Sequence, residues 1–499
     1  MELLANLTHG FDVAVTPINL LYCLFGVTLG TLIGVLPGIG PAATLAMLLP
    51  MTFSLSPITS LIMLAGIYYG SQYGGSTTAI LVNLPGEASS AVTTLDGYQM
   101  ARQGRAGAAL GVAAIGSFVA GTVATLLLAV FAPPLSKVAL SFGSPEYFSL
   151  MVFGLIGAVV LASGSLLKAI GMVLLGLATG LVGPDIETGN QRFTFGAENL
   201  YDGINVVIVA MGLFAFAEIV LNLDHTEERR SYTKDVHGLL PSLEDLRRIV
   251  NPVLRGTTIG SFLGVLPGGG PLLAAFAAYT VEKKVASDPS RFGRGAIEGV
   301  AAPESANNAG AQTSFIPLLT LGIPTTATMA LMLGAMTMQG INPGPQVVSK
   351  SPDLFWGMIA SMWLGNAMLV VLNLPMIGIW VRLLTVPYRL LYPAILLFCC
   401  IGLTSLDNRA FDLYLGAAFG FAGYVLLKLG CEPAPFLLGF ILGPSMEENL
   451  RRALVLSRGD FAVLVEQPIS AAFLLAAAAL LVAVIVPAVR KRREEAFHE

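Results

Sequence analysis

The octapeptide GVLPGIGP occupies Gly34–Pro41, and a nearly identical octapeptide, GVLPGGGP, occupies Gly264–Pro271. Each lies in the middle of an apolar run, although glycine and proline both disfavour a continuous helix. The likeness extends upstream, because Gly26 and Gly30 also recur 230 residues later. Self-similarity at one fixed period predicts that the chain contains two copies of one structural unit.

The composition places these two copies in a lipid bilayer. Of the 499 residues, 55% are hydrophobic and only 12% are charged, and the mean hydropathy is +0.76. A water-soluble fold could not bury that much apolar surface. We therefore expect an all-α polytopic membrane protein with about ten to twelve membrane-embedded segments. The apolar stretches long enough to cross the hydrocarbon include 108–132, 147–162, 203–221, 354–381 and 469–489.

Several functional classes do not fit this sequence. The four cysteines lie within or beside apolar segments and have no metal-ligand spacing, which argues against a disulfide or zinc role. The four histidines lie in polar or terminal segments, no Asp pair faces another across apolar spans, and no G-x-x-x-x-G-K-[ST] loop occurs, so we expect neither an enzyme nor an ATP-driven pump. No feature suggests nucleic-acid binding or a cofactor.

The distribution of Lys and Arg predicts the orientation in the membrane. These residues accumulate at 102–105, 224–255, 283–294 and 490–493, which the positive-inside rule places in the cytoplasm. Because no Lys or Arg precedes Arg102, we expect the N-terminus outside, no cleavable signal peptide, and a chain start that belongs to the mature protein. The C-terminus is expected in the cytoplasm.

One long polar stretch divides the chain into two halves. It reads LDHTEERRSYTKDVHGLLPSLEDLRRIVNPVLR and separates two runs of apolar segments. The predicted organisation is a first repeat at 1–222, a cytoplasmic connecting segment at 223–255, a second repeat at 256–465, and a C-terminal transmembrane helix with a basic cytoplasmic tail at 466–499.

The flanks of the two octapeptides predict opposite topologies. Arg255 and Lys283 bracket the second octapeptide at a separation of about 26 residues, which is too short for two full crossings. The second copy should therefore be a re-entrant hairpin that enters and leaves on the cytoplasmic side. The first copy has no basic flanks and should enter from outside. Inverted repeats of this kind are typical of secondary transporters, and by analogy we expect an elevator-type carrier.

Backbone groups at the two hairpin tips are the first predicted part of a site. Free N–H groups at the start of the outgoing helix favour an anion, and carbonyls at the end of the incoming helix favour a cation such as Na⁺. An alternative is that each octapeptide only kinks a helix or allows a close helix crossing. The substrate-binding residues predicted at the tips are Pro37, Gly38, Gly40, Pro267, Gly268 and Gly270.

A second pair of motifs supplies polar side chains. YGGSTTAILVNLPGEASS (73–90) and PESANNAGAQTSFIPLLTLGIPTT (303–326) place hydroxyl and amide groups beside glycine and proline, which predicts discontinuous helices whose unwound centres meet the tips. The predicted substrate-binding side chains are Ser76, Thr77, Thr78, Asn307, Asn308, Thr313, Ser314 and Thr325. The predicted coupling-ion residues are Gly38, Asn83, Gly268, Glu304 and Gln312.

Other interpretations of these polar residues remain open. Each could hydrogen-bond neighbouring helices together without binding a ligand. Glu304 is the strongest candidate for a coupling-ion ligand or proton acceptor, because ionisable groups in membrane segments are usually functional, but it could instead cap a helix or face the cytoplasm. Apart from Na⁺, no metal is predicted.

Several long motifs, in order, resemble the large membrane subunit TctA of the bacterial tripartite tricarboxylate transporters. They are the twin octapeptides, TTLDGYQMARQGRAGAALG (93–111), APESANNAGAQTSFIPLLTLGIP (302–324) and LGFILGPSMEENLRRALVLSRGDF (438–461). The resemblance covers nearly the whole chain. It implies a small membrane subunit of the TctB type, a periplasmic solute-binding protein of the TctC type, and a location in the bacterial inner membrane.

The resemblance also implies a function. The expected protein imports an organic acid anion, a tri- or dicarboxylate such as citrate, by cation symport, with Na⁺ as the expected cation. Alternatives are a proton-coupled carrier for another carboxylate or an aromatic acid, and a passive anion channel. Because neither octapeptide contains Lys or Arg, backbone dipoles and bound cations must offset the charge of the solute.

Overall fold

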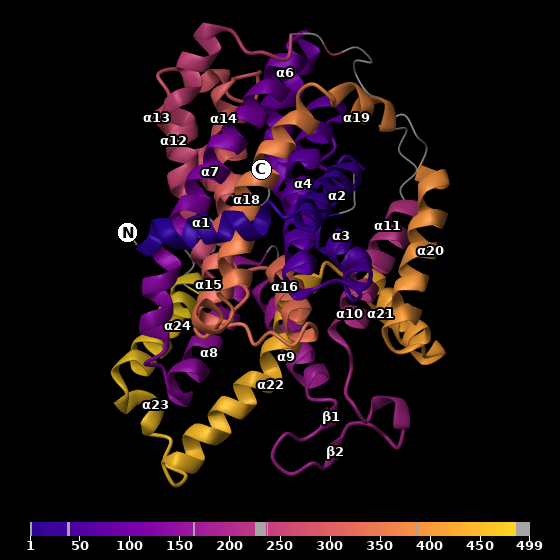
Figure 1. Ribbon diagram of the computed structural model, residues 1–499, viewed down its shortest axis with the longest axis vertical. Helices are drawn as coiled ribbons and strands as arrows, with labels where there is room; N and C mark the ends of the chain where they lie inside the picture. The colour runs from indigo at the N-terminus through magenta and orange to yellow at the C-terminus, as the bar shows by residue number, and fades with distance from the viewer. Residues whose placement is uncertain are drawn as a thin grey trace.

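The computed structural model of this chain is built almost entirely of helices (Figure 1). It describes residues 2–36, 40–162, 165–224, 236, 238–384 and 388–485. One short antiparallel sheet pairs β1 (Gly183–Pro184) with β2 (Gln191–Arg192). The two strands lie at one end of the long axis of the molecule, and α6 (Gln99–Arg102) lies toward the other end.

The elements of the first half follow the apolar runs of the sequence. They are α1 (Glu2–Ala14), α2 (Pro17–Gly34), α3 (Pro41–Leu48), η1 (Leu49–Thr52), α4 (Pro57–Val82), η2 (Ala88–Ser90), α5 (Ala91–Thr93), η3 (Thr94–Tyr98), α6, α7 (Ala106–Ala139), α8 (Ser144–Leu161), α9 (Leu166–Gly180), β1, β2, η4 (Glu198–Leu200), α10 (Val206–Ala210), η5 (Met211–Phe216) and α11 (Ala217–Asp224).

The second half begins within the polar stretch 223–255, because α12 already starts at Leu243. Its elements are α12 (Leu243–Val265), α13 (Gly270–Val285), η6 (Pro289–Arg291), α14 (Glu298–Thr313), α15 (Phe315–Leu321), α16 (Ala327–Met338), α17 (Val347–Lys350), α18 (Pro352–Asn373), α19 (Ile377–Leu383), α20 (Tyr388–Asp407), α21 (Ala410–Lys428), α22 (Pro433–Leu456), α23 (Val463–Glu466) and α24 (Pro468–Ile485).

Six helical segments of the described chain are long and apolar enough to cross a membrane. They are 17–34, 106–139, 144–161, 206–223, 352–373 and 410–428, and shorter apolar helices accompany them. The expectation of an all-α polytopic membrane protein is confirmed. The apolar stretch 354–381, expected as one span, is divided, because α18 ends at Asn373 and α19 begins at Ile377.

Two rows of glycines hold the central helices in close contact. We call Gly26, Gly30 and Gly34 the first glycine stripe, and Gly256, Gly260 and Gly264 the second glycine stripe. A Cβ atom added anywhere on the first stripe would lie 2.3–2.4 Å from a carbonyl oxygen of α4, at Met63, Ile67 and Ser71. On the second stripe it would lie 2.2–2.4 Å from a carbonyl oxygen of α14, at Ala302, Ala306 and Gly310. At Gly264 it would also lie 2.3 Å from the Thr313 hydroxyl. Small residues at this spacing let two helix backbones approach each other closely.

The helix α4, which receives the first stripe, and the helix α15, which continues α14, also end alike. Asn83 terminates α4 with φ 61° and ψ 25°, and Gly322 terminates α15 with φ 70° and ψ 25°. A proline follows two residues later in each case, at Pro85 and Pro324. Proline disfavours helical backbone angles at the residue that precedes it. The chain then has no helix until the next helical turns begin at Ala88 and Ala327.

The unwound segments therefore lie later in the chain than the sequence predicted. Ser76, Thr77 and Thr78 lie within the continuous helix α4, and Asn307 and Asn308 lie within the continuous helix α14. The breaks come at 83–87 and 322–326 instead. Both breaks fall within the predicted stretches 73–90 and 303–326 but beyond their centres, because small polar residues are compatible with helix whereas a left-handed residue followed by X-Pro is not.

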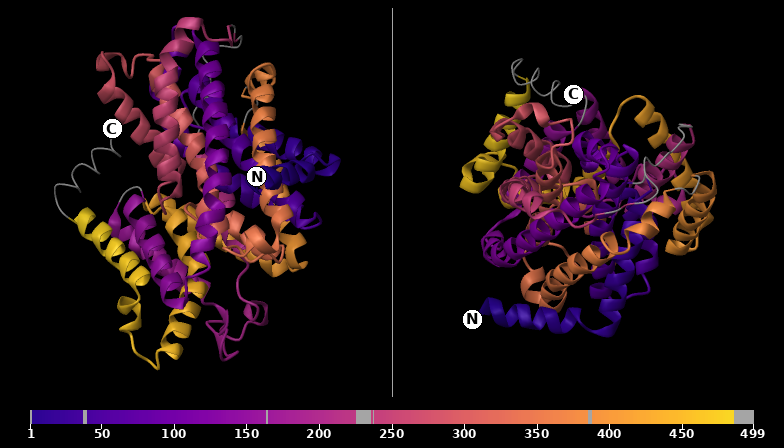
Figure 2. Two further views of the ribbon diagram at one scale, coloured as in Figure 1. Left: turned by 60° about the vertical axis from the view of Figure 1, so that its left-hand side comes forward. Right: turned by 90° about the horizontal axis from the view of Figure 1, so that it is seen from above.

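The second octapeptide forms a turn between two packed helices. α12 and α13 lie side by side (Figures 1 and 2), with Leu266–Gly269 between them. In the first copy, α2 ends at Gly34 and α3 begins at Pro41, while Pro37 and Gly38 lie outside the described residues. The predicted break of the helix is thus found at both octapeptides.

A second group of helices packs below these central helices in Figure 1. It consists of α8, α9, α22 and α24, with α9 running along α22. Gly176 and Gly180 of α9 allow this approach, because a Cβ atom at either would lie 2.1–2.3 Å from a carbonyl oxygen of α22. The N-terminal end of α22 and the C-terminal end of α8 thereby reach the turn of the second octapeptide.

Candidate functional site

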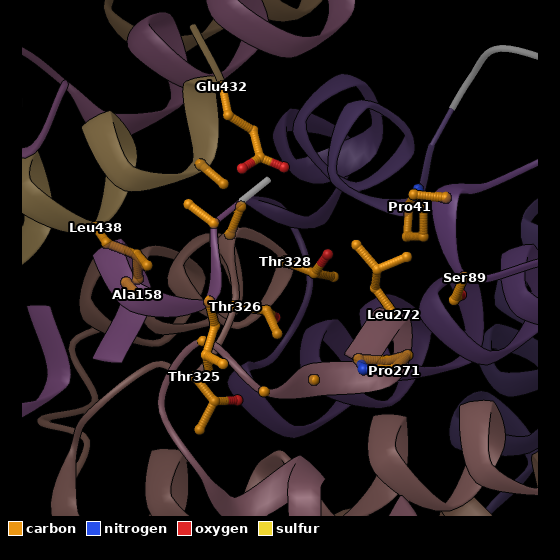
Figure 3. A pocket seen from close by; sticks show the side chains of 18 of the residues that line it. Pro41, Ser89, Ala158, Pro271, Leu272, Thr325, Thr326, Thr328, Glu432 and Leu438 are labelled. Carbon is orange, nitrogen blue, oxygen red and sulfur yellow. The ribbon is translucent and has the colours of Figure 1, made fainter. Parts of the chain in front are cut away.

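A cavity of about 210 Å³ lies where the broken segments of both halves meet α8 and α22 (Figure 3). Both unwound segments contribute to its wall, together with the turn of the second octapeptide. The lining residues are Pro41, Tyr68, Gln72, Glu87, Ala88, Ser89, Ala158, Leu161, Ala162, Gly268, Gly269, Gly270, Pro271, Leu272, Thr325, Thr326, Ala327, Thr328, Glu432, Ala434, Pro435 and Leu438.

Four helices begin at residues that line the cavity or adjoin its wall. They are α3, α13, α16 and α22, which begin at Pro41, Gly270, Ala327 and Pro433. The first amides of a helix have no intrahelical partner, and the helix dipole places a partial positive charge there. The wall of this cavity is therefore electropositive through its backbone, and such surroundings favour an anion.

The turn of the second octapeptide is fixed against the second unwound segment. Gly268 has φ 76°, and its amide donates a hydrogen bond of 2.8 Å to the carbonyl oxygen of Thr325. Gly270 has φ 52°, and a Cβ atom there would lie 2.5 Å from the methyl group of Thr326. Glycine is required at both positions because left-handed backbone and close packing exclude a side chain.

Threonines at the start of α16 add hydroxyl groups to the wall. The Thr326 hydroxyl accepts a hydrogen bond of 3.2 Å from the amide of Met329 and caps the helix. Thr325 is fully buried, yet its hydroxyl has no hydrogen-bond partner within the described chain. A buried hydroxyl without a partner is costly, and its position on the cavity wall points to a ligand as the missing partner.

The charged side chains of the wall are both acidic. Among the described residues that line the cavity, Glu87 and Glu432 are the carboxylates, and none is Lys, Arg or His. Figure 3 shows Glu432 on the side of the cavity opposite Pro271. An anion in this cavity would meet helix amides and hydroxyl groups, but it would also need a cation to offset the carboxylates.

Three of the residues predicted from the sequence line this cavity, namely Gly268, Gly270 and Thr325. Gly40 adjoins it as the residue before Pro41 and the N-cap of α3. Pro267 packs behind the turn, because a Cβ atom at Gly157 would lie 2.8 Å from the Pro267 carbonyl oxygen. Pro37 and Gly38 lie outside the described residues.

A second group of predicted residues forms a separate polar cluster away from the cavity wall. Ser76 donates a hydrogen bond of 2.5 Å to one oxygen of Glu304, and Thr93 donates one of 2.5 Å to the other. Thr77 lines a neighbouring void of about 10 Å³ together with Ser76. The Thr78 hydroxyl donates to the carbonyl oxygen of Val35. This cluster joins α4 to α14 and α5.

The remaining predicted residues belong to α4, α14 and its continuation. Asn308 donates to the hydroxyl of Ser117 on α7, and Asn307 donates to Glu87. The side chains of Thr313 and Ser314 donate to carbonyl oxygens of Ala309 and Gly310, respectively. Asn83 ends α4, and the amide oxygen of Gln312 is buried without a partner in the described chain.

Several lining residues were not predicted. They are Tyr68, Gln72, Glu87, Ser89, Thr326, Thr328 and Glu432. The signal for two of them was present, since Glu87 follows the LPG sequence of the first half just as Thr326 follows the IPT sequence of the second. Tyr68 and Gln72 lie in an apolar helix and Glu432 lies far along the chain, so only the fold brings them to this wall.

A multi-pass helical protein with a cavity between broken helices belongs to the class of membrane transport proteins rather than to the enzymes. The chain is a member of the tripartite tricarboxylate transporter TctA family, whose model matches residues 20–438. Membership makes it a membrane subunit of a tripartite transporter, a kind of system that also has TctB and TctC components. The resemblance inferred from the motifs is thereby confirmed.

Two relatives from Agrobacterium vitis are similar along their whole lengths. The protein described as "Uncharacterized 52.8 kDa protein in TAR-I ttuC' 3'region" is 60% identical over 499 residues, which cover 100% of this chain and 99% of the relative. The "Uncharacterized protein in TAR-II ttuC' 3'region" is 58% identical over 240 residues, 48% of this chain and 99% of that relative. No solved structure matches this chain.

Proposed function

We propose that this protein is the large membrane subunit of a binding-protein-dependent secondary transporter that imports a tri- or dicarboxylate such as citrate together with Na⁺. The observation that carries the proposal is the cavity wall, in which four helices begin and the buried hydroxyl of Thr325 lacks a partner within the described chain. Such a wall suits carboxylate oxygens, which accept hydrogen bonds from amides and hydroxyl groups.

The cation requirement follows from the charges of the cavity wall. The buried carboxylate of Glu87 lines the cavity, and no ion pair within the described residues includes it. A polyanionic solute beside it would therefore add negative charge in a medium of low dielectric constant. A co-transported cation removes that charge and couples uptake to an ion gradient. Na⁺ is the proposed cation.

The proposed setting is the bacterial inner membrane. The N-terminus lies in the periplasm, and the C-terminus lies in the cytoplasm. A periplasmic protein of the TctC type delivers the solute, and a small membrane subunit of the TctB type completes the complex. The two halves are inverted repeats, and the helices that carry the broken segments move together past α8, α9 and α22 to expose the cavity alternately.

A thermal-unfolding screen of the purified protein tests the solute class and the coupling together. Citrate and a panel of smaller carboxylates are added in NaCl or in choline chloride at equal ionic strength and constant pH. We expect at least one tri- or dicarboxylate to raise the melting temperature in NaCl and to do so much less in choline chloride. Equal stabilisation in both salts would contradict sodium coupling, and a dependence on pH alone would favour protons.

Uptake by proteoliposomes containing all three subunits separates a carrier from a passive channel. A symporter accumulates labelled citrate against its gradient only when a Na⁺ gradient is imposed. Flux that is insensitive to the Na⁺ gradient and never exceeds equilibrium would identify a channel. The binding protein is added on the outer side of the liposomes, because the proposed mechanism requires it to deliver the solute.

A further inference from the structure

Glu87 places a buried carboxylate on the cavity wall without a basic partner. Glu87 is only 6% exposed, and no ion pair within the described part of the chain includes it. Gly75 leaves room for the Glu87 side chain, because a Cβ atom at Gly75 would lie 2.7 Å from the Cγ of Glu87. A buried carboxylate is stable only when positive charge or hydrogen-bond donors compensate it.

Four oxygen atoms gather at this carboxylate. The hydroxyl oxygen of Ser89 lies 2.5 Å from Oε1 of Glu87, 3.0 Å from Oδ1 of Asn307 and 3.2 Å from Oε1 of Gln72. We call these four atoms the oxygen cluster. A serine hydroxyl has a single hydrogen and can donate it to one acceptor at a time, so the cluster holds more acceptors than donors.

The orientation of the Asn307 amide is set by its other contact. Its Nδ2 donates a hydrogen bond of 2.9 Å to Oε1 of Glu87. Exchanging the amide oxygen and nitrogen would place the oxygen against the carboxylate, which would be repulsive. The Asn307 Oδ1 atom therefore faces Ser89 as an acceptor, so with Glu87 ionised the oxygen cluster has more acceptors than donors.

We infer that the oxygen cluster of Glu87, Ser89, Asn307 and Gln72 is a binding site for one Na⁺ ion in the wall of the cavity, an inference that rests on the proposed function. One carboxylate with three neutral oxygens is the ligand chemistry of a hard cation. Bound Na⁺ satisfies the surplus acceptors, neutralises Glu87 and turns this part of the wall from repulsive to attractive for a carboxylate solute.

The contrast with Glu304 supports the choice of Glu87. Each carboxylate oxygen of Glu304 already accepts a hydrogen bond of 2.5 Å, one from Ser76 and one from Thr93. Glu304 is fully buried and is not part of the cavity wall. Glu87 also accepts two hydrogen bonds, from Ser89 and Asn307, but both go to Oε1, and the acceptor oxygens of Asn307 and Gln72 lie against the same serine. We therefore assign Glu304 to helix packing and Glu87 to ion binding.

The experiment measures sodium binding without any solute. Purified full-length protein is titrated with NaCl, with choline chloride keeping the ionic strength constant at fixed pH, and thermal unfolding is followed by intrinsic fluorescence. Wild type should gain thermal stability with a saturable dependence on Na⁺. Glu87→Gln should lose that dependence, and Ser89→Ala should raise the half-saturating Na⁺ concentration about tenfold, as expected for the loss of one ligand.

Matched variants exclude a general loss of folding. Glu304→Gln removes the other buried carboxylate near this site, and Glu146→Gln removes a buried carboxylate that accepts a hydrogen bond from the Gly143 amide outside the cavity. Both variants should keep the wild-type response to Na⁺. The response is the difference between NaCl and choline chloride within one variant, so a uniformly lower melting temperature does not imitate it. A wild-type response in Glu87→Gln, or its loss in Glu304→Gln instead, overturns the inference.

Citrate in a second titration separates this inference from the proposed function. If wild type responds to Na⁺ through Glu87 but no carboxylate stabilises it, the ion site stands and the proposed solute class fails. If carboxylates stabilise the protein but neither Na⁺ nor Glu87→Gln changes their effect, the transporter stands and the sodium site fails. Stabilisation that follows pH and ignores Na⁺ also overturns the sodium site.

Discussion

The two unwound segments share one backbone design but bring opposite chemistry to the cavity. The first follows α4, which receives the first glycine stripe, and the second follows α15, which continues the helix α14 that receives the second stripe. Each begins with a left-handed residue and X-Pro. Each then reaches an extended residue, Glu87 with φ −143° and ψ 162°, and Thr326 with φ −139° and ψ 167°. The repeated backbone therefore presents a carboxylate in one half and a helix-capping hydroxyl in the other.

The two segments also differ in the helix that comes after the extended residue. After Thr326 the chain forms the 12-residue helix α16, whose free amides begin at the cavity. After Glu87 it forms only the three-residue turn η2 and then short helical pieces. A longer helix carries a larger dipole, so the second unwound segment offers positive backbone charge and the first unwound segment offers negative side-chain charge. One backbone design can thus serve an anion and a cation side by side.

Alanine at the centre of either glycine stripe should have the largest effect. In Gly260→Ala the new methyl group would lie 2.2 Å from the Ala306 carbonyl oxygen, and in Gly30→Ala it would lie 2.3 Å from the Ile67 carbonyl oxygen. Because backbone meets backbone, the helices must separate, at a cost of about 3 kcal/mol or more in the free energy of unfolding. Fluorescence-detected gel filtration and thermal unfolding should show little monodisperse protein.

Gly171→Ala is the matched control for the glycine stripes. Gly171 also lies within a helix, but an added Cβ atom there has no neighbour within 4 Å. This variant should unfold at or slightly above the wild-type temperature, since alanine favours helix more than glycine does. If alanine destabilised the protein in only one of the two stripes, the two halves would not be structurally equivalent.

The glycine stripes show how much of the fold the sequence could supply. The spacing of Gly26, Gly30 and Gly34 and its recurrence 230 residues later were visible directly, and composition indicated the helical membrane fold. The partner helices were harder to align, because Met63 corresponds to Ala302, an offset of 239 rather than 230. The nine additional residues lie between the octapeptide and the partner helix and hide the register.

That shifted register explains which residues of the site were missed. The turn at Gly268 was predicted because glycine and proline encode backbone geometry locally. The equivalence of Glu87 and Thr326 depends on the offset of 239, so neither residue was singled out. Hydroxyl and amide groups of α4 and α14 were assigned to the cavity, although several instead bond to other helices, since sequence does not reveal which face of a fully buried helix meets a void.

Gly268→Ala should reduce uptake strongly without preventing folding. The added methyl group would lie 2.7 Å from the Gly157 carbonyl oxygen, and the φ of 76° is strained for alanine by about 1–2 kcal/mol. Displacement of the turn should therefore lower citrate uptake about tenfold. The measurement is sodium-driven uptake into proteoliposomes, normalised to the amount of inserted protein.

Gly40→Ala is the comparison in the first half. Gly40 has φ −70°, and no atom of the described residues lies within 4 Å of an added Cβ. The loss of uptake should therefore be much smaller than in Gly268→Ala. Equal losses would mean that solute or a moving element approaches Gly40 as closely as the protein packs around Gly268, and the two halves would then be more alike at the cavity than their static contacts indicate.

The smallest expected effect comes from the residue at which the two halves differ. Thr326→Ala removes the hydroxyl that accepts the Met329 amide and should lower the free energy of unfolding by about 1 kcal/mol, the usual cost of a lost N-cap. Thr326→Ser keeps the hydroxyl, so its free energy of unfolding and its half-saturating citrate concentration should both match those of the wild type. Because Glu87 does not contact this helix cap, the sodium-dependent shift in melting temperature should stay unchanged in both variants. Loss of that shift in Thr326→Ala would contradict the division of anion and cation binding between the two unwound segments. A hydroxyl on the second segment would then control ion binding at the first segment.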